Sequence, residues 1–138
     1  IMDNQSTSGE KSKIEKCPFC RPHPRHVHYT DHIGMIMDDG FPVSQGHVLV
    51  VPRGHYSTVF EMPHPQHQHL FGLVKKAQEI ICQRYAPDGF NIGLNSGKAA
   101  GQTVPHAHIH VIPRYTGDVE DPRGGVRWVI PEKAEYWR

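Results

Sequence analysis

The stretch HAHIHVIP, residues 106–113, places three histidines at every second position of a chain that contains twelve in all. Successive side chains of a β-strand point to opposite faces, so the histidines would share one face and the intervening apolar residues the other. The two faces hold, respectively, His106, His108 and His110, and Ala107, Ile109 and Val111. The apolar face can pack on a core without help from the histidines. An exposed polar face is the simplest alternative, but three histidines in this register are rare, and we expect a functional site.

Two kinds of chemistry suit such a row of imidazoles. Imidazole is the commonest side-chain ligand of zinc. A neutral ring also carries a lone pair on one nitrogen and can attack phosphorus when the other nitrogen keeps its proton. A rigid strand favours this second role because it restricts the angle of attack. The residues of the stretch leave both roles open.

The surrounding chain predicts four strands and one long helix. Apolar residues at 70, 73, 74, 77, 80, 81 and 85 follow a period near 3.6, which predicts a helix that Pro87 and Gly89 end. The expected strands cover residues 32–37, 47–52, 90–95 and the histidine stretch itself, with a turn at 38–42. The run at 47–52 is typical of a strand buried on both faces.

Length and charge set limits on the class of protein. The 138 residues suffice for one domain with a hydrophobic core. The net charge of 15 − 14 = +1 does not favour nucleic acid or an anionic membrane as a partner. There is no transmembrane or signal-peptide pattern, so we expect a cytoplasmic protein. Residues 1–16 are polar and predict a flexible tail, followed by a single domain at 17–138.

A pair of cysteines precedes the first expected strand. The spacing Cys17-x-x-Cys20 forms half of a zinc site, although it also suits a redox pair. In a reducing compartment a metal site or a redox pair is favoured over a structural disulfide. The third cysteine, Cys82, lies in the region of the expected helix, and we expect it to be a small buried residue there.

The chain resembles the histidine triad (HIT) proteins. Residues 106–112 match their signature of three histidines alternating with apolar residues, and the likeness extends from Cys17 to about Tyr115. Residues 46–50, Asn95 and 101–104 also stand in the expected places, and the tail at 121–127 is similar to that of bacterial members. The resemblance implies an α+β, HIT-like fold: an antiparallel sheet of about five strands with one main helix at about 65–86. It also implies a C-terminal extension from about residue 116 and a homodimer.

The resemblance implies hydrolysis or transfer of a nucleotide at its α-phosphorus. His108 would be the nucleophile that forms a nucleotidyl-histidine intermediate. His110 and His47 would contact the phosphates, and Asp39 would accept hydrogen bonds from the ribose. The loop would supply donors to the phosphates and leaving group from Asn95, Gly101, Gln102 and Thr103. The expected substrates are purine nucleotides, namely dinucleoside polyphosphates such as diadenosine tetraphosphate, or adenosine phosphoramidates.

The resemblance also implies one structural zinc ion per chain. Its ligands would be Cys17, Cys20, His55 and His106, which form a closed tetrahedral set. The sequence contains no phosphate-binding loop and no acidic cluster for magnesium, and we expect no organic cofactor. Other histidines could compete for the metal: His23, His26, His28, His64, His67 and His69.

Three alternative functions remain at this point. The same intermediate could pass its nucleotide to phosphate or a sugar phosphate, which would make the protein a nucleotidyltransferase or phosphorylase. The chain could be a nucleotide- or protein-binding module with vestigial activity, although binding alone would not require His108. A metal-storage or redox role would predict more than one metal per chain or a cycling disulfide.

Overall fold

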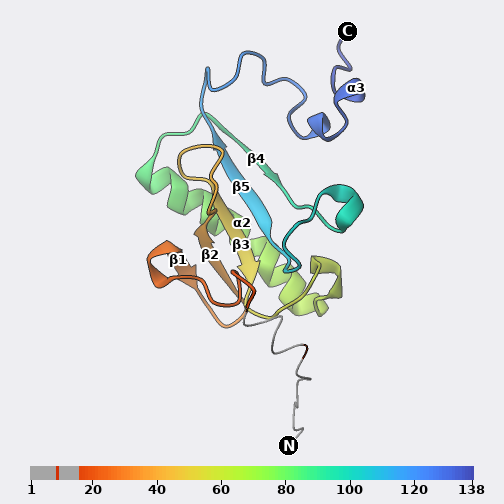
Figure 1. Ribbon diagram of the computed structural model, residues 1–138. Helices are drawn as coiled ribbons and strands as arrows, with labels where there is room; N and C mark the ends of the chain where they lie inside the picture. Colours follow the sequence, from red (N-terminus) through yellow and green to blue (C-terminus); the bar gives the residue numbers. More distant parts are fainter. Residues whose placement is uncertain (1–8, 10–15) are drawn as a thin grey trace, which may run out of the picture.

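The computed structural model describes residue 9 and residues 16–138, so our expectation of a flexible tail at 1–16 lies almost wholly outside the described residues. A five-stranded antiparallel sheet has the strand order β1-β2-β3-β5-β4. Its strands are β1 (Val27–Thr30), β2 (Gly34–Asp38), β3 (Val48–Pro52), β4 (Gly89–Gly93) and β5 (Ile109–Arg114). The helix α2 (His64–Arg84) packs across one face of this sheet (Figure 1). The expected α+β fold is therefore confirmed.

Short helical elements occupy the connections. They are the 3₁₀ helices η1 (Pro24–His26), η2 (Val59–Glu61), η3 (Lys98–Ala100) and η4 (Gly125–Val129), and the single-turn helix α3 (Pro131–Ala134). After β5 the chain leaves the sheet, and η4 returns beside β4 (Figure 1). Among the described residues, no helix is both long and apolar enough to span a membrane.

The helix packs on the sheet through the stripe that the sequence predicts. Its buried residues are Leu70, Leu73, Ala77 and Ile81. They meet a layer of β-branched side chains from the sheet, including Ile36, Val50 and Val111. Such burial contributes about 1.5–3 kcal/mol for each large apolar side chain, which makes this layer the main source of stability.

The opposite face of the sheet carries a second apolar cluster. It consists of Met35, Met37, Leu49 and Val51, with Phe19 and Val27 packed against them. All five residues of β3 are consequently buried, which confirms the prediction of a strand covered on both faces. Of the two faces, this second one also carries the row of histidines.

The strand of the histidine stretch begins later than we expect from the sequence. β5 starts at Ile109, so His106 and His108 precede its ladder. The reason is a different set of contacts: the Ala107 backbone N–H donates to the Tyr56 carbonyl at 2.7 Å rather than to a neighbouring strand. The alternation nevertheless persists, because Ala107 and Ile109 are both buried in the layer beneath α2.

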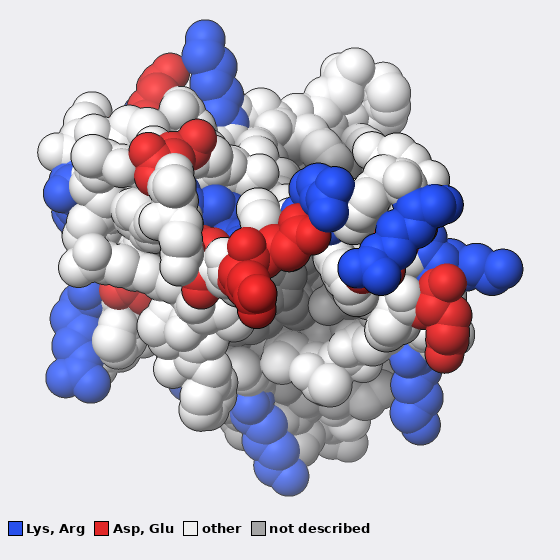
Figure 2. Space-filling model, turned by 90° about the horizontal axis from the view of Figure 1, so that it is seen from above, with Lys and Arg blue, Asp and Glu red and all other residues white. Residues whose placement is uncertain are grey.

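Charged side chains are dispersed over the surface. In the view from above, basic and acidic residues alternate and neither sign forms a continuous patch (Figure 2). This distribution agrees with the small net charge of +1.

Candidate active site and metal centre

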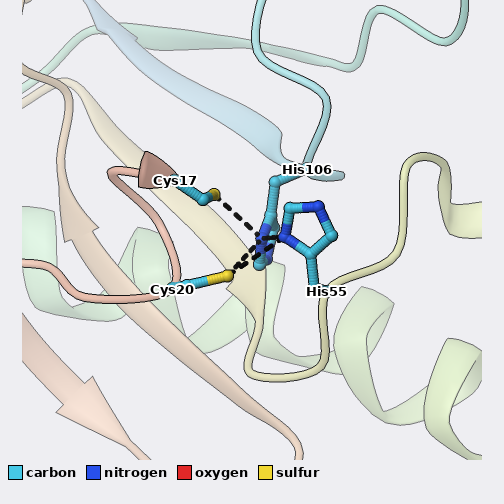
Figure 3. A group of neighbouring side chains, drawn as sticks. All are labelled: Cys17, Cys20, His55 and His106. Atoms are coloured by element: carbon cyan, nitrogen blue, oxygen red, sulfur yellow. Dashed lines mark hydrogen bonds between the residues drawn. The ribbon is translucent and has the colours of Figure 1, made fainter. Parts of the chain in front are cut away.

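Two cysteines and two histidines meet beside the start of β5. Their sulfur atoms and Nδ1 atoms point toward a common centre, although the residues come from three separate segments (Figure 3). Cys17 Sγ and Cys20 Sγ each lie 3.4 Å from His106 Nδ1, and Cys20 Sγ lies 3.0 Å from His55 Nδ1. The two Nδ1 atoms are 3.1 Å apart. The structure thus brings together all four residues that the sequence predicts as metal ligands.

The donor set fits a tetrahedral metal ion. Ligand atoms held at about 2.0–2.3 Å from one such ion would lie about 3.3–3.8 Å apart, close to the separations found here. His106 Nε2 lies 2.8 Å from the Pro52 carbonyl, which can only accept, so Nε2 holds the proton and Nδ1 offers its lone pair to the centre. The three cysteines are free thiols, so no disulfide competes for the sulfurs of this pair.

Burial shapes the protonation of these ligands. It lowers the pKa of the fully buried His106 ring to about 4, which keeps the ring neutral and able to bind a metal. Burial also raises the pKa of the Cys20 thiol to about 12, with a further contribution from the adjacent Cys17. A cation at the centre would supply the positive charge that a thiolate pair lacks.

His108 is held in one tautomer by the backbone. Its Nδ1 lies 2.8 Å from the His106 carbonyl oxygen, so Nδ1–H donates and Nε2 keeps the lone pair. The ring lines a cavity of about 640 Å³. Two further rings pack on it with centroid distances of 4.9 Å from Phe19 and 5.1 Å from His110. His108 therefore presents a nucleophilic nitrogen on a ring restricted from several sides.

His47 and His110 form a hydrogen-bonded pair beside His108. The Val43 backbone N–H donates to His47 Nδ1 at 3.1 Å, so His47 Nε2 holds the proton and donates to His110 Nδ1 at 2.9 Å. His110 consequently keeps its own proton on Nε2. Burial lowers the pKa of both rings, and neighbouring histidines lower that of His110 further, against the opposing effect of Asp39.

Asp39 approaches this pair from the end of β2. Its Oδ2 lies 3.4 Å from His47 Nε2 and 3.6 Å from His110 Nδ1. Three potential ligand atoms therefore come close together, but a metal would need a lone pair at His47 Nε2, where the Val43 amide enforces a proton. The trio does not fit a cation, and it is better described as a polar wall of the cavity.

The cavity is lined both by histidines and by apolar side chains. Its lining includes Phe19, Met37, Phe41, Leu49, Asp39, Asn95, Gly101, Gln102, Thr103, His108 and His110. Its volume lies within the range of about 300–1,000 Å³ that is typical of small-ligand sites, and apolar walls with a few polar groups are equally typical. Of the expected catalytic and substrate-binding residues, His47 lies behind His110 and the others line the cavity directly.

The Gln102 side chain forms hydrogen bonds with backbone groups of the protein's own loops. Its Nε2 donates to the carbonyls of Ser57 at 2.7 Å and Val104 at 3.0 Å, while its Oε1 accepts from the Gly97 amide at 2.9 Å. All three contacts fix the loop in front of β5. Donation from Gln102 to a substrate stays a prediction, and it would require one of these bonds to open.

A second cavity adjoins the first. It measures about 410 Å³ and shares Asn95 and His110 with the larger one. The C-terminal segment contributes Gly125, Val126 and Val129 to its lining. The segment beyond the sheet thus shares this cavity with His47 and His110.

Sequence patterns alone do not reveal the apolar walls of the cavity or the polar network of Arg84, His28 and Asp38. Phe19, Met37 and Leu49 read as core residues, and only their place in the fold shows that they also face the cavity. At the edge of the sheet, Arg84 donates to His28 Nδ1 at 3.0 Å, and His28 Nε2 donates to Asp38 at 2.6 Å. Because Arg84 and His28 are 56 positions apart, no local pattern could have joined them.

Comparisons with known proteins agree with this architecture. Residues 21–117 match the family model of the HIT domain. An uncharacterized HIT-like protein of Methanocaldococcus jannaschii is 41% identical over 108 residues, which cover 75% of this chain and 83% of that protein. An adenylylsulfatase of Arabidopsis thaliana is 33% identical over 128 residues, with 86% and 65% covered.

Two further relatives bear on substrate and metal. An asymmetrical bis(5'-nucleosyl)-tetraphosphatase of Schizosaccharomyces pombe is 38% identical over 80 residues, which cover 58% of this chain and 44% of that protein. The crystal structure of a Zn-bound histidine triad family protein from Mycobacterium smegmatis aligns with a TM-score of 0.69 at 30% identity, covering 78% of this chain and 81% of that one.

Proposed function

The chain belongs to the HIT domain family, and from that premise we propose that it is a nucleotide hydrolase acting at the α-phosphorus through a nucleotidyl-His108 intermediate. The observation that carries the proposal is the tautomer of His108. The Nδ1–H group donates a hydrogen bond to the His106 carbonyl oxygen, which leaves the lone pair on Nε2, and the ring lines a cavity large enough for a nucleotide.

The reaction would proceed by two displacements. His108 Nε2 attacks the α-phosphorus, an N–P bond forms, and the bond from phosphorus to the leaving group breaks with its electron pair departing on that group. Water then attacks the same phosphorus and releases one proton to the solvent, the N–P bond breaks, and a nucleoside monophosphate leaves. The imidazole lone pair returns to Nε2, which restores the resting ring.

The neighbouring pair would steady the charge on the phosphate. Because His47 donates to His110 Nδ1, the His110 Nε2–H is free to donate to a phosphate oxygen. Both rings are neutral near pH 7, so the contact is a hydrogen bond oriented in advance rather than a full ion pair. Asn95, Gly101 and Thr103 border the same space and would complete the phosphate contacts.

We expect a purine nucleoside in the apolar part of the cavity, with Asp39 near the ribose. Phe19 and Leu49 offer apolar surface for a base, and Asp39 offers carboxylate oxygens for hydroxyl groups. Dinucleoside polyphosphates and adenosine phosphoramidates are the proposed substrates. The similarity to a bis(5'-nucleosyl)-tetraphosphatase and to an adenylylsulfatase supports this class.

The metal centre would hold one structural zinc ion. Cys17, Cys20, His55 and His106 would occupy all four positions of a tetrahedral ion, which leaves none for substrate. When bound, the ion would cross-link the N-terminal loop to the residues in front of β5. The Zn-bound relative supports this assignment.

We also propose a homodimer. β4 is an edge strand of the sheet, and apolar side chains around it are exposed, including Ile92, Val126 and Val129. An unpaired edge beside exposed apolar surface favours association with another chain. Light scattering on the purified protein would measure twice the chain mass of 15.7 kDa if the proposal holds.

Intact-protein mass spectrometry tests the central proposal. Wild type and His108→Ala are mixed briefly with diadenosine tetraphosphate or an adenosine phosphoramidate, and products are followed in parallel. An acid-labile adenylyl adduct on wild type alone, with turnover lost in the variant, is the expected result. Turnover that survives in His108→Ala would overturn the nucleophile assignment. Added phosphate distinguishes transfer from hydrolysis, because a phosphorylase would release a nucleoside diphosphate.

A further inference from the structure

Phe19 stands between the two cysteines of the metal centre and touches the proposed nucleophile. Its ring lies 4.9 Å from the His108 ring, centroid to centroid, at an interplanar angle of 64°. It also meets the His106 ring edge-on at 5.9 Å and 90°. One side chain therefore contacts both a proposed metal ligand and the group proposed to attack phosphorus.

The loop that carries Phe19 is held in place by side chains. Phe19 lies in the turn formed by residues 18–20. This turn is fixed to the rest of the fold where Cys17 and Cys20 face His106 Nδ1, and where Phe19 packs on the cluster around Leu49. Separation of the cysteines from His106 would release both ends of the turn that presents the Phe19 ring.

His108 needs a restraint beyond its hydrogen bond. The contact from Nδ1 to the His106 carbonyl sets the tautomer, but a single hydrogen bond lets the ring swing about that point. The Phe19 ring packs against the His108 ring and restricts this rotation from one side. In a close-packed site such a contact narrows the range of attack angles.

We propose that Phe19 is a positioning residue that couples the metal centre to the His108 ring, so that metal occupancy sets how well the nucleophile is aligned. This inference rests on the proposed function. A metal ion at the centre would be held by Cys17 and Cys20 and would fix the turn between them. The turn holds Phe19, and Phe19 restrains the His108 ring.

A competing role makes a different kinetic prediction. Phe19 also lines the cavity, and a wall that only binds the base would change KM and leave the rate of adenylylation at saturating substrate unchanged. A positioning role lowers that rate at saturating substrate, whether or not KM changes as well. Phe19→Leu removes the aromatic edge, while Phe19→Tyr keeps it, so the two variants form a matched pair.

The first measurement is the single-turnover rate of adenylylation at saturating diadenosine tetraphosphate, on zinc-loaded protein whose metal content has been verified. We expect Phe19→Leu to lower this rate between about 10- and 100-fold and Phe19→Tyr to restore most of it. Removing zinc from wild type should produce a similar loss, and removing it from Phe19→Leu should add little, because coupled changes are not additive. Additive losses, or a change confined to KM, would overturn the proposal.

The second measurement uses the resting protein. With ¹³C-labelled histidine, the ring protons of His108 should show the ring-current shift of Phe19, assigned by comparison with His108→Ala. We expect that shift in zinc-loaded wild type and Phe19→Tyr, and its loss in Phe19→Leu. A His108 signal identical in wild type and Phe19→Leu would refute the contact. These spectra test the contact between Phe19 and His108 even if wild type forms no adenylyl intermediate, an outcome that would count against the proposed function instead.

Discussion

His47 Nε2 lies 2.9 Å from His110 Nδ1, and only His47 can donate across this contact because the Val43 amide already occupies its other nitrogen. A backbone amide thus determines, through two rings, which nitrogen of His110 carries a proton toward the cavity. The direction of the chain follows from the fact that an amide N–H cannot accept.

Replacement of His47 tests this chain. His47→Ala removes the donor to His110 Nδ1, and we expect the single-turnover rate to fall between about 10- and 100-fold because His110 loses its fixed tautomer. His47→Gln can still donate from its side-chain amide and should lose less than about tenfold. Equal losses in the two variants would show that the donated proton is not what matters.

The pH dependence of stability follows from the two buried rings. Burial lowers the pKa of His47 and His110 in the folded chain, whereas in the unfolded chain both rings bind protons near pH 6.5. The unfolded state therefore binds more protons at these two sites below that pH, so their contribution to the free energy of unfolding is constant well above about pH 6.5 and falls as the pH drops through and below it. Denaturant unfolding at pH 8, 7, 6 and 5 measures this. His110→Gln, which removes one of the rings, should show a smaller decline between pH 7 and 5, and an unchanged decline would contradict the argument.

Gly46 precedes His47 and adopts a positive φ of 92°. A Cβ atom there would also lie 2.9 Å from the Tyr85 ring. We expect Gly46→Ala to lower the free energy of unfolding by about 2 kcal/mol, through backbone strain and this overlap, and to slow catalysis by shifting His47. Gly93→Ala is the control, since a Cβ at that position meets nothing within 4 Å. Equal stability of the two variants in urea would contradict the expectation.

Loss of a cysteine ligand should reduce both the zinc content and the thermal stability of the protein. Cys17→Ser is expected to reduce bound zinc well below one ion per chain and to lower Tm by at least about 5 °C, because metal affinity contributes to folding. Cys82→Ser is the matched control, since that thiol lies outside the cluster and is exposed on α2, so the expectation that it is buried is wrong. Metal analysis and calorimetry on both proteins provide the comparison. Full zinc content in Cys17→Ser would remove that residue from the ligand set.

The sequence predicts the helix and most of the sheet because their signals are local. The stripe from Leu70 to Ile81 lies within one helix, and the actual bounds of α2 differ from the expected ones by two residues or fewer. β1 escaped the analysis because its four residues, Val27–Thr30, include His28 and Thr30 and show no apolar alternation. A strand of this kind gains its place from pairing with β2 rather than from its own pattern.

Some features of the site are likewise predictable from the sequence, and others are not. The four candidate metal ligands could be named from their types and from the family resemblance, and the structure brings them to one centre. The tautomers could not be named, because they depend on the Val43 amide, the His106 carbonyl and the Pro52 carbonyl, which any residue would supply. The engagement of Gln102 with Ser57 and Gly97 was equally invisible for this reason.

The mixed surface charge has a kinetic consequence for a substrate that is itself a polyanion. With no continuous basic patch on the face in Figure 2 and a net charge of only +1, long-range attraction contributes little to the encounter. Association should then depend weakly on ionic strength, and discrimination among nucleotides would arise from how long each one stays rather than how often it arrives. The association rate of such a protein would be similar at low and at high ionic strength. It would also be lower than that of an electrostatically steered protein, which matters most when the substrate is scarce.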